Sequence, residues 1–185
     1  MSTNQKDKNN SINVIIPENI SVDITDNQLI VTGQLGTLKK DFTTIRAYLK
    51  KVDDQINIKS FGTKKKELAM LKTVKSLITN LFSGVTEGFT YKLKLVYSHF
   101  PMTVRVENNN VYVDNFIGGK FPRIAKIVGE STVTPKDDDI IVSGLSIENV
   151  SQTAANIESC TKIKNKDLRV FLDGVYIYEK GKGQN

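Results

Sequence analysis

His99 and Cys160 are the two residues of this sequence that could form a nucleophile and its base. Each is the only one of its kind in the chain, and a thiol beside an imidazole is the pairing that cysteine enzymes use. A lone histidine cannot supply the ligand set of a zinc hydrolase, and nothing flanking Cys160 indicates an activated thiol. We therefore expect Cys160 to be a small buried residue on a helix, and we predict no catalytic residue.

Two other patterns could bind ions or phosphates. The acids of residues 137–139 are consecutive, so their side chains point in different directions, and no calcium-loop spacing follows them. Gly33 with Gly36, and Gly118 with Gly119, lack the third glycine of a dinucleotide-binding loop, and the sequence contains no P-loop. We expect a solvated turn at 137–139, and we predict no metal, no cofactor and no small-molecule substrate.

Basic and aromatic residues alternate in two segments of the second half. Lysines contact phosphates, arginine and tyrosine stack on bases or reach the 2′-hydroxyl, and glycines let the backbone approach a phosphate. The net charge of +6 and the pI of about 9.3 are typical of a protein with a polyanionic partner. The residues alone leave both nucleic-acid binding and a merely solvated charged surface open. The segments contain Lys92, Lys94, Tyr97, His99 and Phe100, and then Lys162, Lys164, Lys166, Arg169, Phe171, Tyr176, Tyr178, Lys180 and Lys182.

Length and composition indicate a folded protein in a reducing compartment. The 185 residues suffice for one large or two small domains, and the 39% of hydrophobic residues suffices for a packed core. One cysteine excludes an internal disulfide framework. The first residues have no apolar stretch of the kind found in secretory signals, and no apolar run approaches the ~20 residues that span a bilayer. We expect a cytosolic protein without a membrane partner.

Short alternating runs in the first half predict strands joined by hairpins, and a longer run predicts a helix. Asp26-Asn27 and Asp53-Asp54 are typical hairpin turns. Apolar residues at three- and four-residue steps from Leu68 to Val85 predict an amphipathic helix, which Gly84 or Gly88 would end. The expected strand pairs are 20–24 with 29–31 and 48–52 with 56–60.

The second half repeats this plan. Ser146 is a suitable N-cap for a helix with apolar residues from Ile147 to Ile157 on one face. The pattern of residues 20–31 also returns at 102–113, which we interpret as an internal duplication. The expected strands are 89–97, 103–106, 111–113 and 140–142.

We therefore predict an α+β fold made of two tandem copies of an antiparallel sheet packed against a helix. Residues 1–11 would form a flexible N-terminal tail. Residues 12–86 would form the first domain, and residues 87–185 the second, with a basic C-terminal RNA-binding segment.

Three motifs in this frame carry a resemblance to a known family. They are GVTEGFTYK at 84–92, VYSHFP at 96–101 and KNKDLRVFLDGVYIYEKG at 164–181. With shorter matches in the expected order, the chain resembles the universal large-subunit ribosomal protein six family, called protein nine in eukaryotic large subunits. The resemblance covers essentially the whole chain after the tail. The shorter matches are IPE at 16–18, GTLKKDF at 36–42, KELA at 66–69, NF at 115–116 and VSQTAA at 150–155.

The resemblance implies a structural protein of the cytoplasmic large ribosomal subunit, whose assembly can begin in the nucleolus. Its partners would be large-subunit ribosomal RNA, near the translation-factor-binding region and the sarcin–ricin loop, and neighbouring large-subunit proteins. Most RNA contacts would come from the second domain. Carried onto this chain, the RNA-binding residues are Lys92, Lys94, His99, Lys164, Asn165, Lys166, Arg169, Gly174, Tyr176, Lys180 and Gly181.

Some positions depart from the family pattern. Members usually have proline and a basic residue at Gln34 and Leu35, and a basic residue at Thr90 and Val170, so individual phosphate contacts can differ here. Two other readings stay open. One is a free-standing RNA-binding or assembly factor, and the other is a small enzyme whose Cys160 and His99 lie within hydrogen-bond reach.

Overall fold

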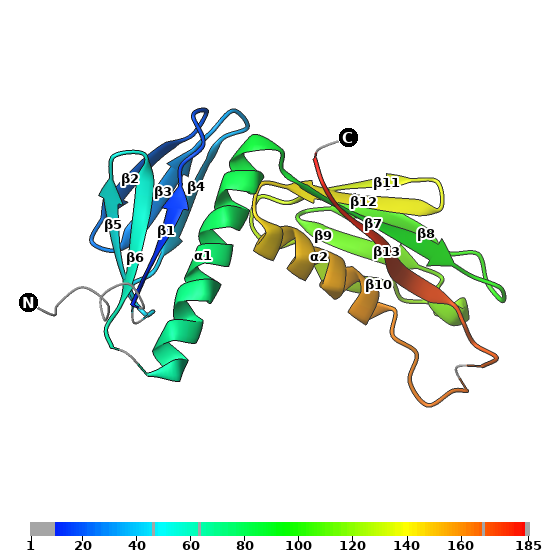
Figure 1. Cartoon of the computed structure of the whole chain (residues 1–185). Coiled ribbons are helices and arrows are strands. Elements are labelled where there is room, and N and C mark those ends of the chain that lie inside the picture. The colour runs from blue at the N-terminus through cyan, green and yellow to red at the C-terminus, as the bar shows by residue number, and fades with distance from the viewer. Residues whose placement is uncertain (1–9, 46, 63, 168, 184–185) are drawn as a thin grey trace, which may run out of the picture. The chain divides into compact units, whose positions relative to one another are not determined.

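The computed structural model describes residues 10–45, 47–62, 64–167 and 169–183. The chain divides into two compact units, Met1–Thr86 and Glu87–Asn185 (Figure 1). Most of the expected tail, residues 1–9, lies outside the described residues. Ser11 belonged to that expected tail, but it is the first residue of a strand and pairs with Lys59.

The described residues of unit 1 form two antiparallel three-stranded sheets and one helix. The hairpin turns lie where the sequence predicts them, with positive φ at Asp26, Asn27 and Asp53. The Asn27 side chain links the two sheets, since its amide donates to the carbonyl oxygens of Phe42 and Ala47 at 3.1 and 2.9 Å. The sheet orders are β1-β6-β5 and β2-β3-β4. The strands are β1 (Ser11–Ile15), β2 (Ser21–Thr25), β3 (Gln28–Thr32), β4 (Thr37–Asp41), β5 (Ala47–Val52) and β6 (Gln55–Ser60).

The helix of unit 1, α1 (Lys65–Thr86), carries the predicted apolar stripe. The stripe is buried against both sheets, because residues three and four apart share one helix face. The expectation that Gly84 ends the helix is wrong: Gly84 is buried inside it. The helix ends before Gly88, whose φ of 77° only glycine adopts readily. The buried residues of the stripe are Leu71, Val74, Ile78, Phe82 and Val85.

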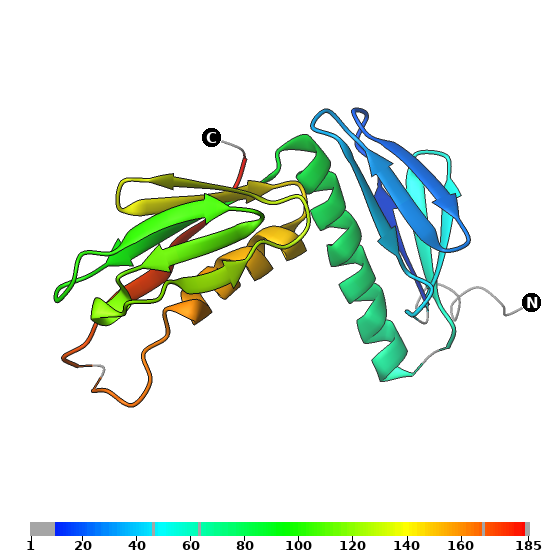
Figure 2. The ribbon, with the colours of Figure 1, turned by 180° about the vertical axis from the view of Figure 1, so that it is seen from behind.

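The part of unit 2 that the structure describes also forms two antiparallel sheets and one long helix, seen from both sides in Figures 1 and 2. The three-stranded sheet has the order β10-β9-β8, and the four-stranded sheet has the order β11-β12-β7-β13. The elements are β7 (Phe89–Val96), β8 (Thr103–Glu107), β9 (Asn110–Asp114), the 3-10 turn η2 (Phe116–Gly118), β10 (Arg123–Lys126), β11 (Thr132–Lys136), β12 (Asp139–Gly144), α2 (Ile147–Cys160) and β13 (Gly174–Lys182).

The helix α2 begins as predicted. The Ser146 hydroxyl caps it by accepting from the backbone N–H of Asn149 at 3.5 Å. Its buried face, including Val150, Ala154 and Ile157, packs against β7, β10, β12 and β13. The result is one core between the helix and the two sheets.

The α+β class and the duplication are confirmed, but the internal plan is richer than predicted. Each unit divides its strands over two sheets, where one sheet per half was expected. The expected order of strands first and helix last holds in unit 1 only, because β13 follows α2 in unit 2 and pairs with β7. A bulge lies between Ile177 and Glu179 and shifts the register of β13 against β7.

Candidate nucleic-acid interface

Strand β13 places one predicted group of residues across from another. Lys94 on β7 is opposite Tyr176 on β13, and Gly174 is opposite Val96. Leu93 is buried in the core, so its neighbours along β7 point to the other face of the sheet. Lys92, Lys94 and Tyr176 therefore share the face that does not carry the core.

Both lysines of this face are paired with carboxylates. Lys92 Nζ lies 3.1 Å from Glu179 Oε2, and Lys94 Nζ lies 3.3 Å from Asp139 Oδ1. The hydrogen bond to Glu179 raises the pKa of Lys92. Exposed ion pairs of this kind contribute little stability and exchange easily with other anions. A phosphate arriving on this face would thus compete with Glu179 and Asp139.

Lys180 and Gly181 lie elsewhere on β13. Because of the bulge, Lys180 is opposite Tyr91, whose side chain packs against the core, and its Nζ lies 5.8 Å from the centre of that ring. Lys180 is thereby on the other face from Lys92. Gly181 is opposite Thr90, and a Cβ there would lie 3.6 Å from the Thr90 carbonyl oxygen, an ordinary contact.

His99 is held by Asp173, a buried residue that the sequence did not single out. One Asp173 oxygen accepts from the backbone N–H groups of Ser98 and His99 at 2.9 and 3.1 Å, and the other lies 2.7 Å from His99 Nδ1. Burial alone would raise the pKa of Asp173. The Ser98 N–H and the His99 ring and N–H outweigh it and lower the pKa to about 2. The ionised carboxylate thus ties the end of β7 to the start of β13.

In the segment between α2 and β13, the described contacts gather around Phe171. The His99 ring stacks on the Phe171 ring, with centres 4.8 Å apart, and Lys166 Nζ lies 4.5 Å from the centre of the same ring. Asn165 has a φ of 58°, which asparagine tolerates. The N–H of Arg169 donates to Asp167 Oδ1 at 2.9 Å. His99 and Lys166 are therefore brought together, although far apart in sequence.

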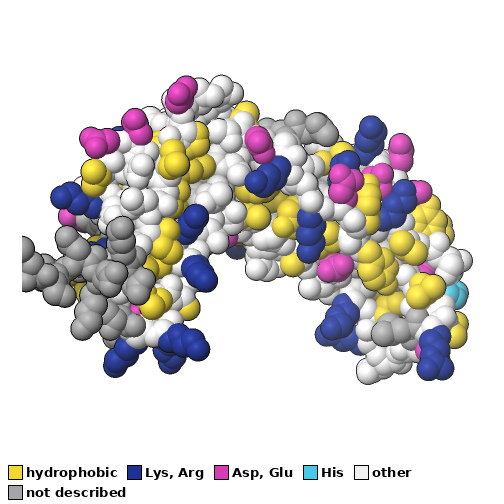
Figure 3. Space-filling view, in the orientation of Figure 1, with side chains coloured by type: hydrophobic (Ala, Val, Ile, Leu, Met, Phe, Trp, Pro, Cys, Tyr) yellow, Lys and Arg dark blue, Asp and Glu magenta, His cyan; other side chains and the backbone are white. Residues whose placement is uncertain are grey.

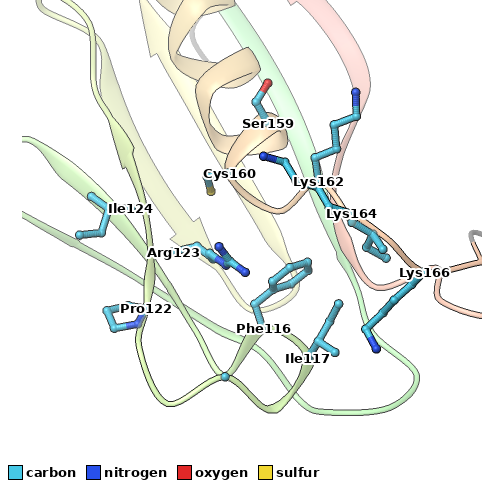
Figure 4. A pocket seen from close by; sticks show the side chains of 12 residues that line it. Phe116, Ile117, Pro122, Arg123, Ile124, Ser159, Cys160, Lys162, Lys164 and Lys166 are labelled. Carbon is cyan, nitrogen blue, oxygen red and sulfur yellow. The ribbon is translucent and has the colours of Figure 1, made fainter.

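Lys164 and Lys166 also line a cavity beside the end of α2, with two cations that are not among the RNA-binding residues carried over from the family resemblance. These are Lys162 and Arg123, the latter on β10 (Figure 4). In the part of the chain that the structure describes, neither Lys164 nor Lys166 forms an ion pair. Basic side chains gather beside exposed hydrophobic ones at this end of unit 2 (Figure 3). No sequence signal pointed to Arg123, which reaches the site only through the packing of β10 against α2.

Gly174, predicted from the sequence only as an RNA-binding residue, also has a steric role. A Cβ at Gly174 would lie 3.2 Å from the Tyr176 hydroxyl. That hydroxyl donates to the Leu172 carbonyl oxygen at 3.2 Å. The glycine thus lets the tyrosine ring fold back over the start of β13.

The alternative pairing of Cys160 with His99 is absent from the described contacts. Cys160 is half-buried, not buried as expected, and its thiol donates to the Ile157 carbonyl oxygen at 3.1 Å. Burial raises the pKa of the thiol to about 11, so it stays protonated at neutral pH. His99 Nδ1 contacts Asp173 instead.

Of the acids of residues 137–139, Asp137 and Asp138 lie at the expected turn, whereas Asp139 is the half-buried first residue of β12. Asp137 has a φ of 52°, and Asp138 accepts from the Tyr97 hydroxyl at 3.2 Å. The described residues include no group of three or more His, Cys, Asp or Glu side chains that could hold a metal ion. Among the described helices, none is long and apolar enough to cross a membrane.

Fold and surface together define a class: a duplicated α+β protein whose second unit presents lysines, an arginine and aromatic rings on an open sheet and a long connecting segment. The family model described as Ribosomal protein L6 matches residues 100–174. Large ribosomal subunit protein uL6 of Staphylothermus marinus is 48% identical over 170 residues, which cover 90% of this chain and 92% of that protein.

Further relatives agree over similar lengths. The uL6 proteins of Methanobrevibacter smithii and Methanococcus vannielii are each 42% identical over 165 residues, which cover 89% of this chain and 93% and 91% of theirs. The chain belongs to the ribosomal protein L6 family, and the resemblance found in its sequence is confirmed. This is a family of structural proteins, not of enzymes.

Proposed function

We propose that this chain is a structural constituent of the large ribosomal subunit, which binds and stabilises large-subunit ribosomal RNA near the translation-factor-binding region and so supports cytoplasmic translation. The observation that carries the proposal is the relationship to uL6 proteins over about nine tenths of the chain. Residues 12–86 would be the first domain, and 87–185 the RNA-binding second domain. Neighbouring large-subunit proteins would be its other partners, and assembly would begin in the nucleolus.

The segment between α2 and β13 supports an RNA-binding role for unit 2. Lys164, Asn165, Lys166 and Arg169 are exposed on it, and the two lysines have no described carboxylate partner. These cations would displace the counterions condensed on the RNA phosphates, so binding would weaken steeply with salt. Asp173 holds the end of this segment in place through three hydrogen bonds to Ser98 and His99.

The face of the sheet would add a second kind of contact. Tyr176 and His99 present hydrogen-bonding groups and ring faces of the type that contact ribose and unpaired bases. Lys92 and Lys94 would contribute after exchanging Glu179 and Asp139 for phosphates. Lys180 and Gly181, further along β13, would meet a different part of the RNA, because Lys180 lies on the other face.

Sedimentation tests the proposal. A tagged chain expressed in cells is followed through a density gradient at low and at moderate salt. We expect it to run with large subunits and polysomes at both. A chain found free, or only with precursor particles, would contradict a structural role and would indicate an assembly factor.

The matched variants are Lys164→Ala with Lys166→Ala, and Lys72→Ala with Lys75→Ala on the exposed face of α1. At low salt, the first pair should leave a larger fraction of the chain free of particles than the second pair. Equal release would contradict the placement of the RNA contacts in unit 2.

A further inference from the structure

We propose that the cavity beside the end of α2 is a pocket for one unstacked nucleotide of the bound RNA. The inference rests on the proposed function and deepens it. The cavity has a volume of about 610 Å³, within the range of roughly 300–1,000 Å³ typical of small-molecule sites. It lies wholly within unit 2, between η2 with β10 on one side and the segment after α2 on the other (Figure 4).

The charges around the cavity select an anion. Arg123, Lys162, Lys164 and Lys166 all line it and are all exposed, and no carboxylate is among the lining residues. The cations come from two separate elements, Arg123 from β10 and the lysines from the segment after α2 (Figure 4). A phosphate in the cavity would meet positive charge from both elements.

The apolar part of the wall favours a ligand that carries more than a phosphate. Phe116 is buried at the base, with Ile117 and Ile163 beside it. The guanidinium carbon of Arg123 lies 5.5 Å from the centre of the Phe116 ring. Arg123 is itself exposed, so its planar group can stack on a base as guanidinium planes do in RNA complexes. A ligand with a flat apolar body and a negative charge uses both parts, and a nucleotide has both.

The backbone at the base of the cavity is held in an uncommon shape. Asn115, Ile117 and Gly118 have φ of 58°, 52° and 68°. A β-branched residue such as Ile117 rarely adopts this conformation, and outliers of this kind persist only where the surroundings impose them. The Asn115 side-chain amide donates to the Pro101 carbonyl oxygen at 2.9 Å and holds the turn. This turn sets Ile117 on the wall of the cavity.

An acidic protein segment is the rival occupant. It would also meet the four cations, but carboxylates on an extended chain make no use of a ring and a guanidinium plane at the base of a single cavity. The described shape therefore favours a nucleotide.

Cys160 makes the test direct, because it is the only cysteine of the chain and lines the cavity. The full chain is bound to transcribed large-subunit RNA, and complex formation is measured by filter binding. The rate of Cys160 alkylation by iodoacetamide is then measured by mass spectrometry at about pH 9, where a buried thiol still reacts slowly. We expect alkylation to be at least about tenfold slower in the complex than in the free chain, since the reagent must enter an occupied space.

The outcomes separate the two proposals. If the complex forms and Cys160 reacts as in the free chain, the pocket proposal is overturned and the proposed function stands. If no complex forms, the proposed function fails, and 5′-AMP added to the free chain decides the pocket alone. AMP should slow alkylation, while inorganic phosphate and hexaglutamate at the same concentration should not. Equal slowing by phosphate, or slowing by hexaglutamate without AMP, would contradict a nucleotide pocket.

Variants sharpen the result. Arg123→Lys keeps the charge and removes the planar group, so the AMP concentration needed for protection should rise about tenfold. Lys164→Ala, on the exposed segment, tests the phosphate contact without touching the Phe116 packing. Lys136→Ala removes an exposed cation that does not line the cavity and should change nothing. Circular dichroism checks that each variant folds. If AMP protected Cys160 from alkylation equally in all variants, the pocket proposal would be overturned.

Discussion

The two units share one plan and differ by one strand. The β1-β6-β5 sheet of unit 1 corresponds to β7-β12-β11 of unit 2, and β2-β3-β4 corresponds to β8-β9-β10. In each unit the helix follows the last of these strands. Unit 2 alone continues past its helix into a further segment and β13, which pairs with β7 along the edge that β1 leaves open in unit 1.

That addition carries most of the proposed interface. The segment after α2 and β13 together hold Lys164, Lys166, Arg169 and Tyr176, and Asp173 anchors them. The six strands and the helix that both units share form the scaffold. The segment after α2 and β13, which have no counterpart in unit 1, carry most of the proposed RNA-binding surface. The comparison predicts that changes in the added part affect unit 2 alone.

The largest effect is expected for Asp173→Ala. The change leaves three donors of Ser98 and His99 without their buried acceptor, and removing a charged buried partner costs about 3 kcal/mol. Hydrogen exchange should show faster opening of β7 and β13 and an unchanged β1 and β6. Asp138→Ala, an exposed acid of the same unit, is the control, and equal opening in unit 1 would break the comparison.

The same carboxylate predicts how stability depends on pH. Its pKa is about 2 in the folded chain against 3.8 for the free group. A lowered pKa stabilises the fold above about pH 4, and this contribution, about 2 kcal/mol, is lost as the pH falls from about 4 to 2. Urea unfolding of unit 2 should show this loss, and Asp173→Asn should remove it. An unchanged pH profile in the variant would refute the role of Asp173.

The paired change Lys164→Ala with Lys166→Ala should weaken RNA binding about tenfold at low salt. Each lost phosphate contact lowers the slope of log affinity against log salt by roughly 0.7–0.9, so the slope should fall by roughly 1.4–1.8 for the two contacts, and the loss of affinity should shrink as salt rises. Filter binding over a salt series measures both. Lys72→Ala with Lys75→Ala in unit 1 should leave the slope nearly unchanged. An equal fall of the slope in this control would contradict the proposal that the RNA contacts lie mainly in unit 2.

The smallest effect is expected for Gly174→Ala. The added Cβ would displace the Tyr176 hydroxyl, 3.2 Å away, from the Leu172 carbonyl oxygen, at a cost of about 1 kcal/mol for the lost hydrogen bond. Thermal unfolding measures this cost. Gly181→Ala is the matched control, since its Cβ would make only an ordinary contact. A larger loss in Gly181→Ala would show that the tyrosine is not the reason for Gly174.

What the sequence could predict was local. The hairpin turns at Asp26-Asn27 and Asp53 and the cap at Ser146 depend on neighbouring residues, so their patterns were readable. Pairing between distant segments was not readable, which is why β13 was missed. Asp173 and Arg123 were missed for the same reason, since only the packed fold brings them to Ser98 and to Phe116.

The pairing of β7 with β13 also has a consequence for the order of synthesis. The Thr90 hydroxyl donates to the Gly183 carbonyl oxygen, a partner 93 residues further along the chain. A domain that closes on such distant contacts folds late, whereas every strand of unit 1 precedes α1. During translation, unit 1 can therefore fold before β13, the strand that pairs with β7, has been synthesised. The strand β13, which carries part of the proposed RNA-binding surface, is thus synthesised after the whole of unit 1.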